Sequence, residues 1–201
     1  MANYKQVIPQ IGAFEGGLSK AQTDSARFDP VPDGSGYHTN KGITWATFKN
    51  LAPRLGYTAT PDLFYKMPEH IWERIFKNGY WDSVGGDHIK SQAIANTLAD
   101  FAWGAGPGTA AKVMQRLLGV FPDGQIGKQT IAAINKQKEK DLFTKLTNAK
   151  KQFYLTLPGQ QANYAGWKTR LDKEWTLNQK LIVAGVAGGG LLAGGLGLFF
   201  Y

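Results

Sequence analysis

The sequence of 201 residues contains no cysteine. Disulfide bonds, a thiolate nucleophile and zinc sites with thiolate ligands are therefore excluded. Histidine is also scarce, and the spacing of His38, His70 and His88 does not match that of metal ligands. The sequence therefore predicts no metal site, and we expect no cofactor.

The first residues, MANYKQVIPQ, lack an apolar stretch, so no cleavable secretion signal is expected. Acidic residues are few, since 15 Asp and Glu stand against 23 Lys and Arg, giving a formal net charge of +8. Such a protein is attracted to polyanions, which include nucleic acid, anionic lipid and the teichoic acids or carboxylates of a cell wall. A nucleic-acid partner would rest on charge alone, because no binding motif is recognisable, and is not expected.

One long apolar run ends the chain. The 21 residues from Leu181 to Tyr201, LIVAGVAGGGLLAGGLGLFFY, carry no charged side chain. As a helix they would extend about 31 Å, close to the thickness of a membrane's hydrocarbon core. The sequence therefore predicts a C-terminal transmembrane helix in contact with the lipid membrane. A buried core helix or a flexible glycine tail is the alternative.

Small residues recur at every fourth position of this run, at Gly185, Gly189, Ala193 and Gly197. On a helix they would form the smooth stripe along which membrane helices pack closely. We therefore expect this stripe to associate with another helix, unless the glycines reflect low complexity only.

The rest of the chain is predicted to be mainly α, because its apolar residues recur at helical spacing. The first helix is expected over residues 3–15, ended by Gly16 and Gly17, and a small β-hairpin over residues 37–43. Further helices are expected to start at Thr44, at Thr60-Pro61 and at Met67-Pro68, and to cover residues 91–103, 109–118 and 142–153, with a short helix around Ile131 and Ile134.

Glu15 is the first candidate for chemistry. It would lie at the C-terminal end of the first helix, where the negative end of the helix dipole raises the pKa of a carboxyl group. A glycosidase acid must hold its proton near neutral pH until the leaving oxygen takes it. The local sequence alone favours a surface glutamate before a helix stop.

A second carboxylate could come from the polar segment that follows. Asp24, Asp29 and Asp33 are all candidates, and in an inverting glycosidase such a group activates water across the sugar ring. Ordinary turn chemistry is the alternative for each, especially for Asp29 and Asp33, which flank prolines. At most one of them is expected to be catalytic.

Two ordered sets of motifs carry a resemblance to a known family. The first set is Glu15-Gly16-Gly17, Asp29-Pro30, Asp33-Gly34, Thr39 and Gly42-Ile43-Thr44. The second is Asp100-Phe101-Ala102, Gly106-Pro107-Gly108, VMQRLLGV, Asp123-Gly124, Gly127 and TIAAIN. The first set resembles the family 108 glycoside hydrolases, N-acetylmuramidases related to phage endolysins and secretion-activator proteins. The second is similar to the helical peptidoglycan-binding region that follows in that family, and the likeness spans residues 7–155.

The resemblance implies a lysozyme-like helical fold and hydrolysis of the β-1,4 bond after N-acetylmuramic acid in bacterial peptidoglycan. The family's catalytic glutamate falls on Glu15, and Thr39 matches a threonine that helps to position water in phage-type lysozymes. The stretch between Gly17 and Thr39 is longer than usual in the family. More than one aspartate can therefore match the partner carboxylate. Asp33 is favoured by its spacing to Gly34 and Thr39, and Asp29 comes next.

Substrate contacts are expected from residues around the hairpin and from one tryptophan. Pyranose faces stack on aromatic rings, so Tyr37 and Trp103 are candidates, together with the polar side chains of Asn40 and Thr44. A position in the core is the more common one for a tryptophan such as Trp103.

The sequence predicts a lysozyme-like catalytic region over residues 1–95, a helical peptidoglycan-binding region over residues 96–176 packed on it, and a membrane anchor over residues 177–201. A membrane-anchored muramidase is the leading interpretation. A lytic transglycosylase on the same substrate, and a non-catalytic wall-binding or membrane structural protein, are the alternatives.

The charged residues that flank the apolar run bear on where the enzyme is located. Lys173 and Lys180 precede the run and no charged side chain follows it, which would keep the enzyme on the cytoplasmic side. Peptidoglycan lies on the other side of the membrane. A phage whose virion has its own membrane would remove this conflict, so the virion membrane of a phage or the bacterial cell envelope is the expected location.

Overall fold

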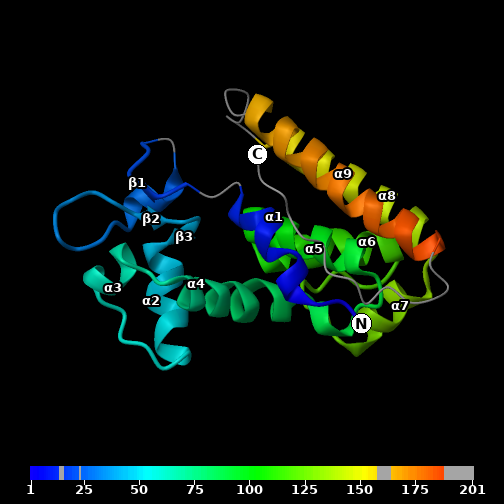
Figure 1. The fold of residues 1–201 in the computed structure, drawn as a ribbon, viewed down its shortest axis with the longest axis horizontal. Helices are drawn as coiled ribbons and strands as arrows, with labels where there is room; N and C mark the ends of the chain where they lie inside the picture. Colours follow the sequence, from blue (N-terminus) through cyan, green and yellow to red (C-terminus); the bar gives the residue numbers. More distant parts are fainter. Residues whose placement is uncertain (14–15, 23, 158–163, 188–201) are drawn as a thin grey trace.

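The computed structural model describes residues 1–13, 16–22, 24–157 and 164–187, and this part of the chain is mainly helical with one small sheet (Figure 1). The helices are α1 (Ile8–Gly12), α2 (Trp45–Arg54), α3 (Pro61–Tyr65), α4 (Glu69–Phe76), α5 (Gln92–Ala105), α6 (Pro107–Leu118), α7 (Lys128–Lys136), α8 (Glu139–Leu155) and α9 (Tyr164–Ala187). Short helical turns cover Tyr4–Gln6, Ser25–Phe28, Lys77–Trp81, Asp82–Val84 and Gly86–His88. The strands are β1 (Leu18–Ser19), β2 (Thr39–Asn40) and β3 (Ile43–Thr44).

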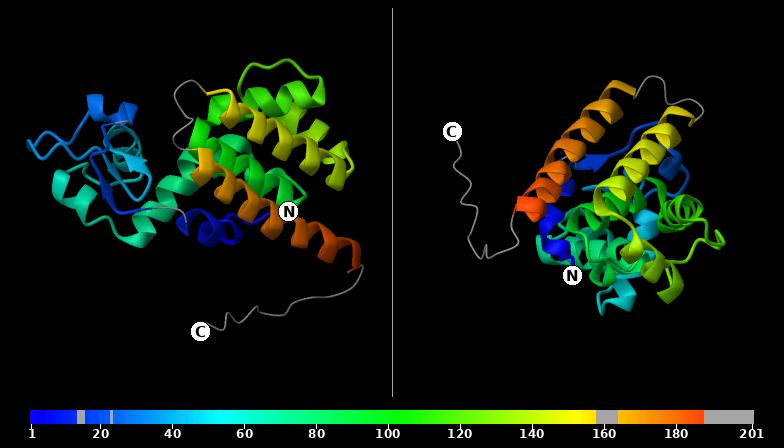
Figure 2. Two further views of the ribbon diagram at one scale, coloured as in Figure 1. Left: turned by 90° about the horizontal axis from the view of Figure 1, so that it is seen from above. Right: turned by 90° about the vertical axis from the view of Figure 1, so that its right-hand side faces the viewer.

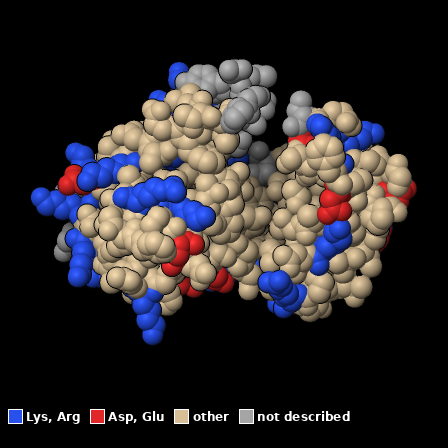
Figure 3. All heavy atoms as spheres, turned by 180° about the vertical axis from the view of Figure 1, so that it is seen from behind, with Lys and Arg blue, Asp and Glu red and all other residues tan. Residues whose placement is uncertain are grey.

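The elements form two lobes. The sheet lies with α2 and α3 in a small lobe, α5 to α9 form a helical lobe, and α4 runs between the two (Figures 1 and 2). On the face turned away from the view of Figure 1, most Lys and Arg side chains gather over the helical lobe (Figure 3). On this face, the positive charge therefore lies mainly on the lobe without the sheet.

The sheet is antiparallel, with the order β1-β2-β3. Thr39 pairs with Ser19 on one side and with Thr44 on the other, so β2 is the central strand. The two-residue turn between β2 and β3 places both Lys41 (φ 46) and Gly42 (φ 74) in the left-handed region, as tight hairpin turns require. The hairpin was expected, and β1 extends it to three strands.

Side-chain caps explain where three of the helices begin. Thr44, Thr60 and Ser91 each accept a hydrogen bond from a backbone N–H in the first turn of α2, α3 and α5. Such a cap satisfies a donor that has no partner within the helix. These starts are local features, and the prediction of a helix at each of them is confirmed.

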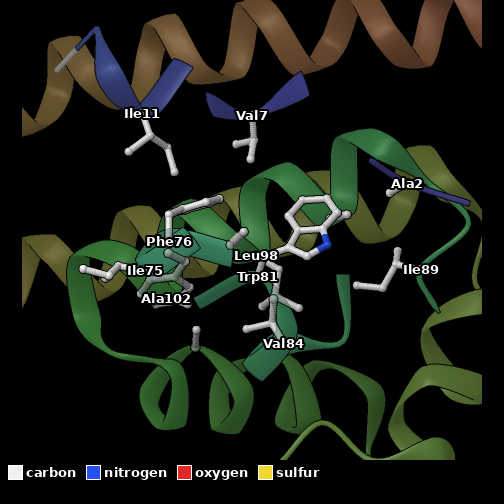
Figure 4. Packing of buried hydrophobic residues seen from close by; sticks show 14 of the residues in the cluster. Ala2, Val7, Ile11, Ile75, Phe76, Trp81, Val84, Ile89, Leu98 and Ala102 are labelled. Atoms are coloured by element: carbon white, nitrogen blue, oxygen red, sulfur yellow. The ribbon is translucent and has the colours of Figure 1, made fainter. Parts of the chain in front are cut away.

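The first helix is shorter than the predicted span of residues 3–15. A 3-10 turn over Tyr4–Gln6 comes first, and α1 then covers five residues with Pro9 in its first turn. Proline has no N–H to donate, so it fits the start of a helix and interrupts one that is already under way. Val7 and Ile11 are fully buried, and they point toward Phe76, Trp81 and Leu98 (Figure 4).

Helix α5 is the centre of the helical lobe. Every residue from Ala93 to Ala102 is buried, and the helix contacts α6, α8 and α9. Burying a large apolar side chain such as Leu98 or Phe101 stabilises a fold by about 1.5–3 kcal/mol. The core is therefore shared by residues from both halves of the chain.

The predicted transmembrane helix is wrong. Among the described residues no helix is both long and apolar enough to cross a membrane. The beginning of the apolar run is the end of α9, which carries charged residues in its earlier turns and packs on α5 and α8. Leu171, Glu174, Asn178 and Ile182 recur at helical spacing and are all buried, so α9 is an amphipathic helix of the fold.

The small-residue stripe cannot be followed along α9. Gly185 lies within the helix, whereas Gly189, Ala193 and Gly197 fall outside the described residues. The residues of α9 that are described as buried lie between positions 171 and 182.

Candidate active site

Glu15 and Phe14 fall outside the described residues, so the site is built here from the groups around that position. α1 ends at Gly12 with Ala13 as its cap. After position 15, the carbonyl of Gly17 accepts a hydrogen bond from the backbone N–H of Lys41 at 3.3 Å. The chain therefore passes from α1 through Glu15 directly into the sheet that carries Thr39.

α1 is shorter than the helix that was expected to raise the pKa of Glu15 through its dipole. A helix of five residues has a small dipole, and the effect falls off within the last turn. The dipole of α1 therefore gives little support to the predicted rise in the pKa of Glu15.

Thr39 is half-buried on the central strand, and its hydroxyl is oriented by a histidine. The Nδ1 atom of His38 lies 2.9 Å from Thr39 Oγ1, and its Nε2 atom lies 3.2 Å from the carbonyl oxygen of Ala21. A carbonyl only accepts, so Nε2 carries a proton, and in the neutral form of the ring Nδ1 accepts the hydroxyl hydrogen of Thr39. The lone pairs of Thr39 are then left to accept from another donor, such as water.

His38 was considered in the sequence only as a possible metal ligand. It is fully buried, and a carboxylate oxygen of Asp24 lies 3.9 Å from its Nδ1 atom. Asp24 also caps the turn Ser25–Phe28 by accepting from Ala26 N at 2.9 Å. No group of three or more His, Asp or Glu residues in the described part of the chain could hold a metal ion.

Asp33 is exposed, and its carboxylate is held by two donors. Oδ1 accepts from Ser35 N at 3.0 Å, and Oδ2 accepts from the hydroxyl of Tyr65 at 2.5 Å. The Tyr65 hydrogen bond, followed by those from Ser35, lowers the pKa of Asp33 to about 2. Burial, and then the hydrogen bond to Asp33, raise the pKa of Tyr65, so the tyrosine remains a donor. Asp33 is thus a fixed negative charge at neutral pH.

Asp29 has a different environment. Its Oδ1 accepts from Lys49 Nζ at 2.9 Å, and both side chains are close to half exposed. The residue also ends the turn Ser25–Phe28. An exposed ion pair of this kind contributes little to stability, and it neutralises the carboxylate locally. Of the two aspartates, Asp33 keeps its charge without a cationic partner among the described residues.

The aromatic candidate Tyr37 joins the Asp33 cluster. Its ring meets that of Tyr65 edge to face at 6.1 Å, and Lys20 Nζ lies 5.2 Å from its centroid. The hydroxyl of Ser35 lies 2.8 Å from that of Tyr65 and accepts from Tyr37 N at 3.2 Å. Tyr65 and Ser35 were not predicted, because only the folded chain brings Tyr65 to Asp33.

The other residues that were predicted to contact the substrate interact with residues of the fold itself. Asn40 is 3% exposed and donates to the carbonyls of Phe64 at 2.6 Å and Tyr65 at 3.2 Å, which ties β2 to α3. Thr44 caps α2. Trp103 lies in the helical lobe, where its ring meets those of Tyr80 at 4.7 Å and Trp72 at 5.5 Å. The structure therefore brings Asp33 and Tyr37 together and places Trp103 in a separate aromatic cluster.

Comparisons with known proteins agree with the two motif sets. Residues 8–106 match the family model described as glycosyl hydrolase 108, and residues 109–172 match the model described as a predicted peptidoglycan domain. The protein is a glycoside hydrolase that acts on peptidoglycan. The chain belongs to the glycosyl hydrolase 108 family, which confirms the resemblance drawn from the motifs.

The fold has a counterpart among solved structures. The structure of Brucella abortus SagA superposes with a TM-score of 0.70 over 90% of this chain and 94% of that chain, with 24% sequence identity. At this identity the likeness concerns the fold alone. A comparison with curated proteins gave no match.

The two matched regions meet between residues 106 and 109. Gly106 has a φ of 86°, which favours glycine, and it separates α5 from α6. The predicted boundary at residue 95 lies inside α5. α5 therefore belongs to the first matched region and packs at the same time against helices of the second.

Proposed function

We propose that the protein is an N-acetylmuramidase that hydrolyses the β-1,4 bond after N-acetylmuramic acid, with Glu15 as its acid and Asp33 as the partner carboxylate. The observation that carries this assignment of the partner is the hydrogen bond from Tyr65, which orients the Asp33 carboxylate and keeps it ionised down to a lower pH. A permanent negative charge suits a group that faces the oxocarbenium-like transition state of glycoside hydrolysis.

The proposed reaction needs one acid, one anion and one positioned water. Glu15 gives its proton to the oxygen of the scissile bond as the bond to the anomeric carbon breaks. A water that donates to Thr39 attacks that carbon, and its proton passes to Asp33 and then to solvent. Solvent returns a proton to Glu15, which completes the cycle. A water that has bonded to such a carbon is strongly acidic, so a carboxylate with a low pKa accepts its proton.

The same proposal places the enzyme at the bacterial cell envelope, because its substrate lies there. A phage origin is supported only by the relation of the motif pattern to phage endolysins. The basic surface of the helical lobe supports attraction to the anionic polymers of the wall (Figure 3).

A digest of purified sacculi tests the proposal. The wild type should release fragments with reducing N-acetylmuramic acid ends, and Glu15→Gln should be at least about a hundredfold slower, because that is the typical contribution of a general acid. Mass spectrometry identifies the ends. Anhydro-muramic ends would assign a lytic transglycosylase instead, and reducing N-acetylglucosamine ends would exclude a muramidase.

A further inference from the structure

A pocket of about 610 Å³ lies between α1 and α9. Pro9, Gln10 and Ala13 line it from the α1 side, and Asp172, Lys173 and Leu177 are among the residues that line it from α9. Figure 4 shows α9 passing over α1 on the side opposite to the buried Val7 and Ile11. A volume of this order is typical of sites for small ligands.

Gln10, one of the residues that line the pocket, carries a buried donor without an acceptor among the described residues. Gln10 is 6% exposed, and none of the described groups accepts a hydrogen bond from its amide Nε2 atom. Buried polar groups are nearly always paired, and an exception calls for an explanation. A ligand that brings an oxygen atom to Nε2 would supply the missing acceptor.

The remaining wall has mixed chemistry. Pro9, Ala13 and Leu177 provide apolar surface, while the neighbouring residues Asp172 and Lys173 bring one negative and one positive charge. The ligand that fits has small apolar groups, carbonyl oxygens, and both a carboxylate and an ammonium group. A short zwitterionic peptide has all of these features.

The substrate itself carries such a peptide. In peptidoglycan a stem of alanine, glutamate and a diamino acid hangs from the lactyl group of N-acetylmuramic acid, the sugar whose bond the proposed function cleaves. Ala13 lines the pocket and precedes Glu15 by two positions, a length of chain that spans at most about 7 Å. A peptide attached to the reacting sugar therefore begins close to the pocket.

We propose that the α1–α9 pocket is a subsite for the peptide stem of peptidoglycan, with Gln10 Nε2 donating to a peptide oxygen and with Asp172 and Lys173 facing the charged ends of the stem. This inference rests on the proposed muramidase activity for its location. It makes the enzyme selective for glycan strands that still carry their peptides.

Two substrates and two variants test the subsite. The ratio of kcat/KM on intact peptidoglycan to that on the same glycan after an amidase has removed the stems measures the preference for peptide. The wild type should prefer the intact polymer. Gln10→Leu removes the donor at similar volume and should lower the ratio by about fivefold, as expected for one hydrogen bond. Thr176→Tyr, at an exposed position that lines the pocket, should lower it by filling the space.

The control variant is Lys180→Gln, which removes a charge from an exposed position of α9 that does not line the pocket. Its ratio should equal that of the wild type. Gln10→Leu should melt no lower than the wild type, since it removes an unpaired buried group. If Gln10→Leu does not fold, Thr176→Tyr decides.

The outcomes separate the subsite from the activity. Equal cleavage of both substrates by the wild type, or ratios unchanged in both variants, would overturn the subsite while the muramidase stands. If neither substrate is cleaved, the proposed function fails. Titration of the protein with a soluble stem tripeptide then tests the pocket by itself: binding weakened by Gln10→Leu supports it, and no binding to the wild type overturns it.

Discussion

Asp33 and Tyr65 illustrate how a single hydrogen bond can set the chemistry of a residue. Asp33 sits on an exposed turn beside a proline, where a structural role would be the usual expectation. The hydroxyl of Tyr65, contributed by α3, keeps its carboxylate ionised and fixes its direction. Asp29, four positions earlier, is instead paired with Lys49.

A pair of isosteric variants distinguishes the two aspartates. We expect Asp33→Asn to lower kcat on peptidoglycan by about a hundredfold, the typical effect of removing one electrostatic contact to a transition state. Asp29→Asn should retain most of the activity, because it breaks only an exposed ion pair. Steady-state kinetics on solubilised peptidoglycan measure both, and the reverse order of effects would assign the partner role to Asp29.

The pH profile tests the part played by Tyr65. Removing its hydroxyl in Tyr65→Phe should raise the pKa of Asp33 from about 2 toward the ordinary value of 3.8. Activity that needs ionised Asp33 is lost as pH falls through this pKa, so the acidic limb should move to higher pH. The control is Tyr57→Phe, which removes a hydroxyl that accepts from Arg74 at 2.6 Å and is not among the groups that shift the pKa of Asp33. An acidic limb at the same pH in both variants would contradict the assignment.

At the scale of elements, a buried ionic cluster joins α5, α8 and α9. Lys150 on α8 is 1% exposed and donates to Asp100 of α5 and, at 2.5 Å, to Glu174 of α9. Arg170 donates to the other oxygen of Asp100 at 2.7 Å. Burial raises the pKa of Asp100, but the charges of Lys150 and Arg170 outweigh it and hold the pKa at about 2.

Removing one partner of this ionic cluster should lower the free energy of unfolding. Lys150→Met removes the cation that donates to both Asp100 and the carboxyl group of Glu174, and it leaves Asp100 with Arg170 alone as its cationic partner among the described residues. We expect a loss of about 3–5 kcal/mol in the free energy of unfolding. Urea denaturation measures the change. Lys151→Met removes the same charge from the next, exposed position of α8 and should be nearly neutral, so a similar loss in both variants would refute the importance of the cluster.

Glu174 makes the stability of the helical lobe depend on pH. Burial raises its pKa to about 8, with the charge of Lys150 acting in the opposite direction, and its Oε1 atom has no partner among the described residues. The folded form therefore holds a proton that the unfolded chain releases above its ordinary pKa of 4.5. The stabilisation is complete below pH 4.5 and is lost as pH rises toward 8.

The melting temperature should therefore fall as the pH rises. Between pH 5 and pH 8 the melting temperature of the wild type should fall more than the melting temperature of Glu174→Gln, because the glutamine stays neutral throughout this range. Asp141→Asn, at an exposed position of α8, serves as the control and should behave like the wild type. Equal slopes for wild type and Glu174→Gln would rule out this account.

At the scale of the whole molecule, the sequence predicted several features that depend on neighbouring residues. The caps at Thr44, Thr60 and Ser91 and the hairpin around Gly42 depend on neighbours within a few residues, and all were found where the pattern indicated. The family motifs likewise led to the correct enzyme class.

Features set by distant parts of the chain were missed. Tyr65 lies 32 positions from Asp33, and Lys150 lies 50 positions from Asp100, so no local pattern reveals either pair. The apolar run suggested a membrane helix because the surfaces of α5 and α8 that receive α9 are not visible in the sequence. The residues assigned to the site, Glu15 above all, stay predictions that the kinetic experiments address.

α5 packs against helices of both matched regions, and this has a consequence for engineering. Residues 109–172 resemble a wall-binding domain that a designer would wish to move onto another enzyme. In the fusion protein Lys150 would lack its partner Asp100. The faces of α6 and α8 that pack on α5 would be exposed to solvent. Because the two matched regions share the core around α5, we expect a graft to fold only if it begins before α5.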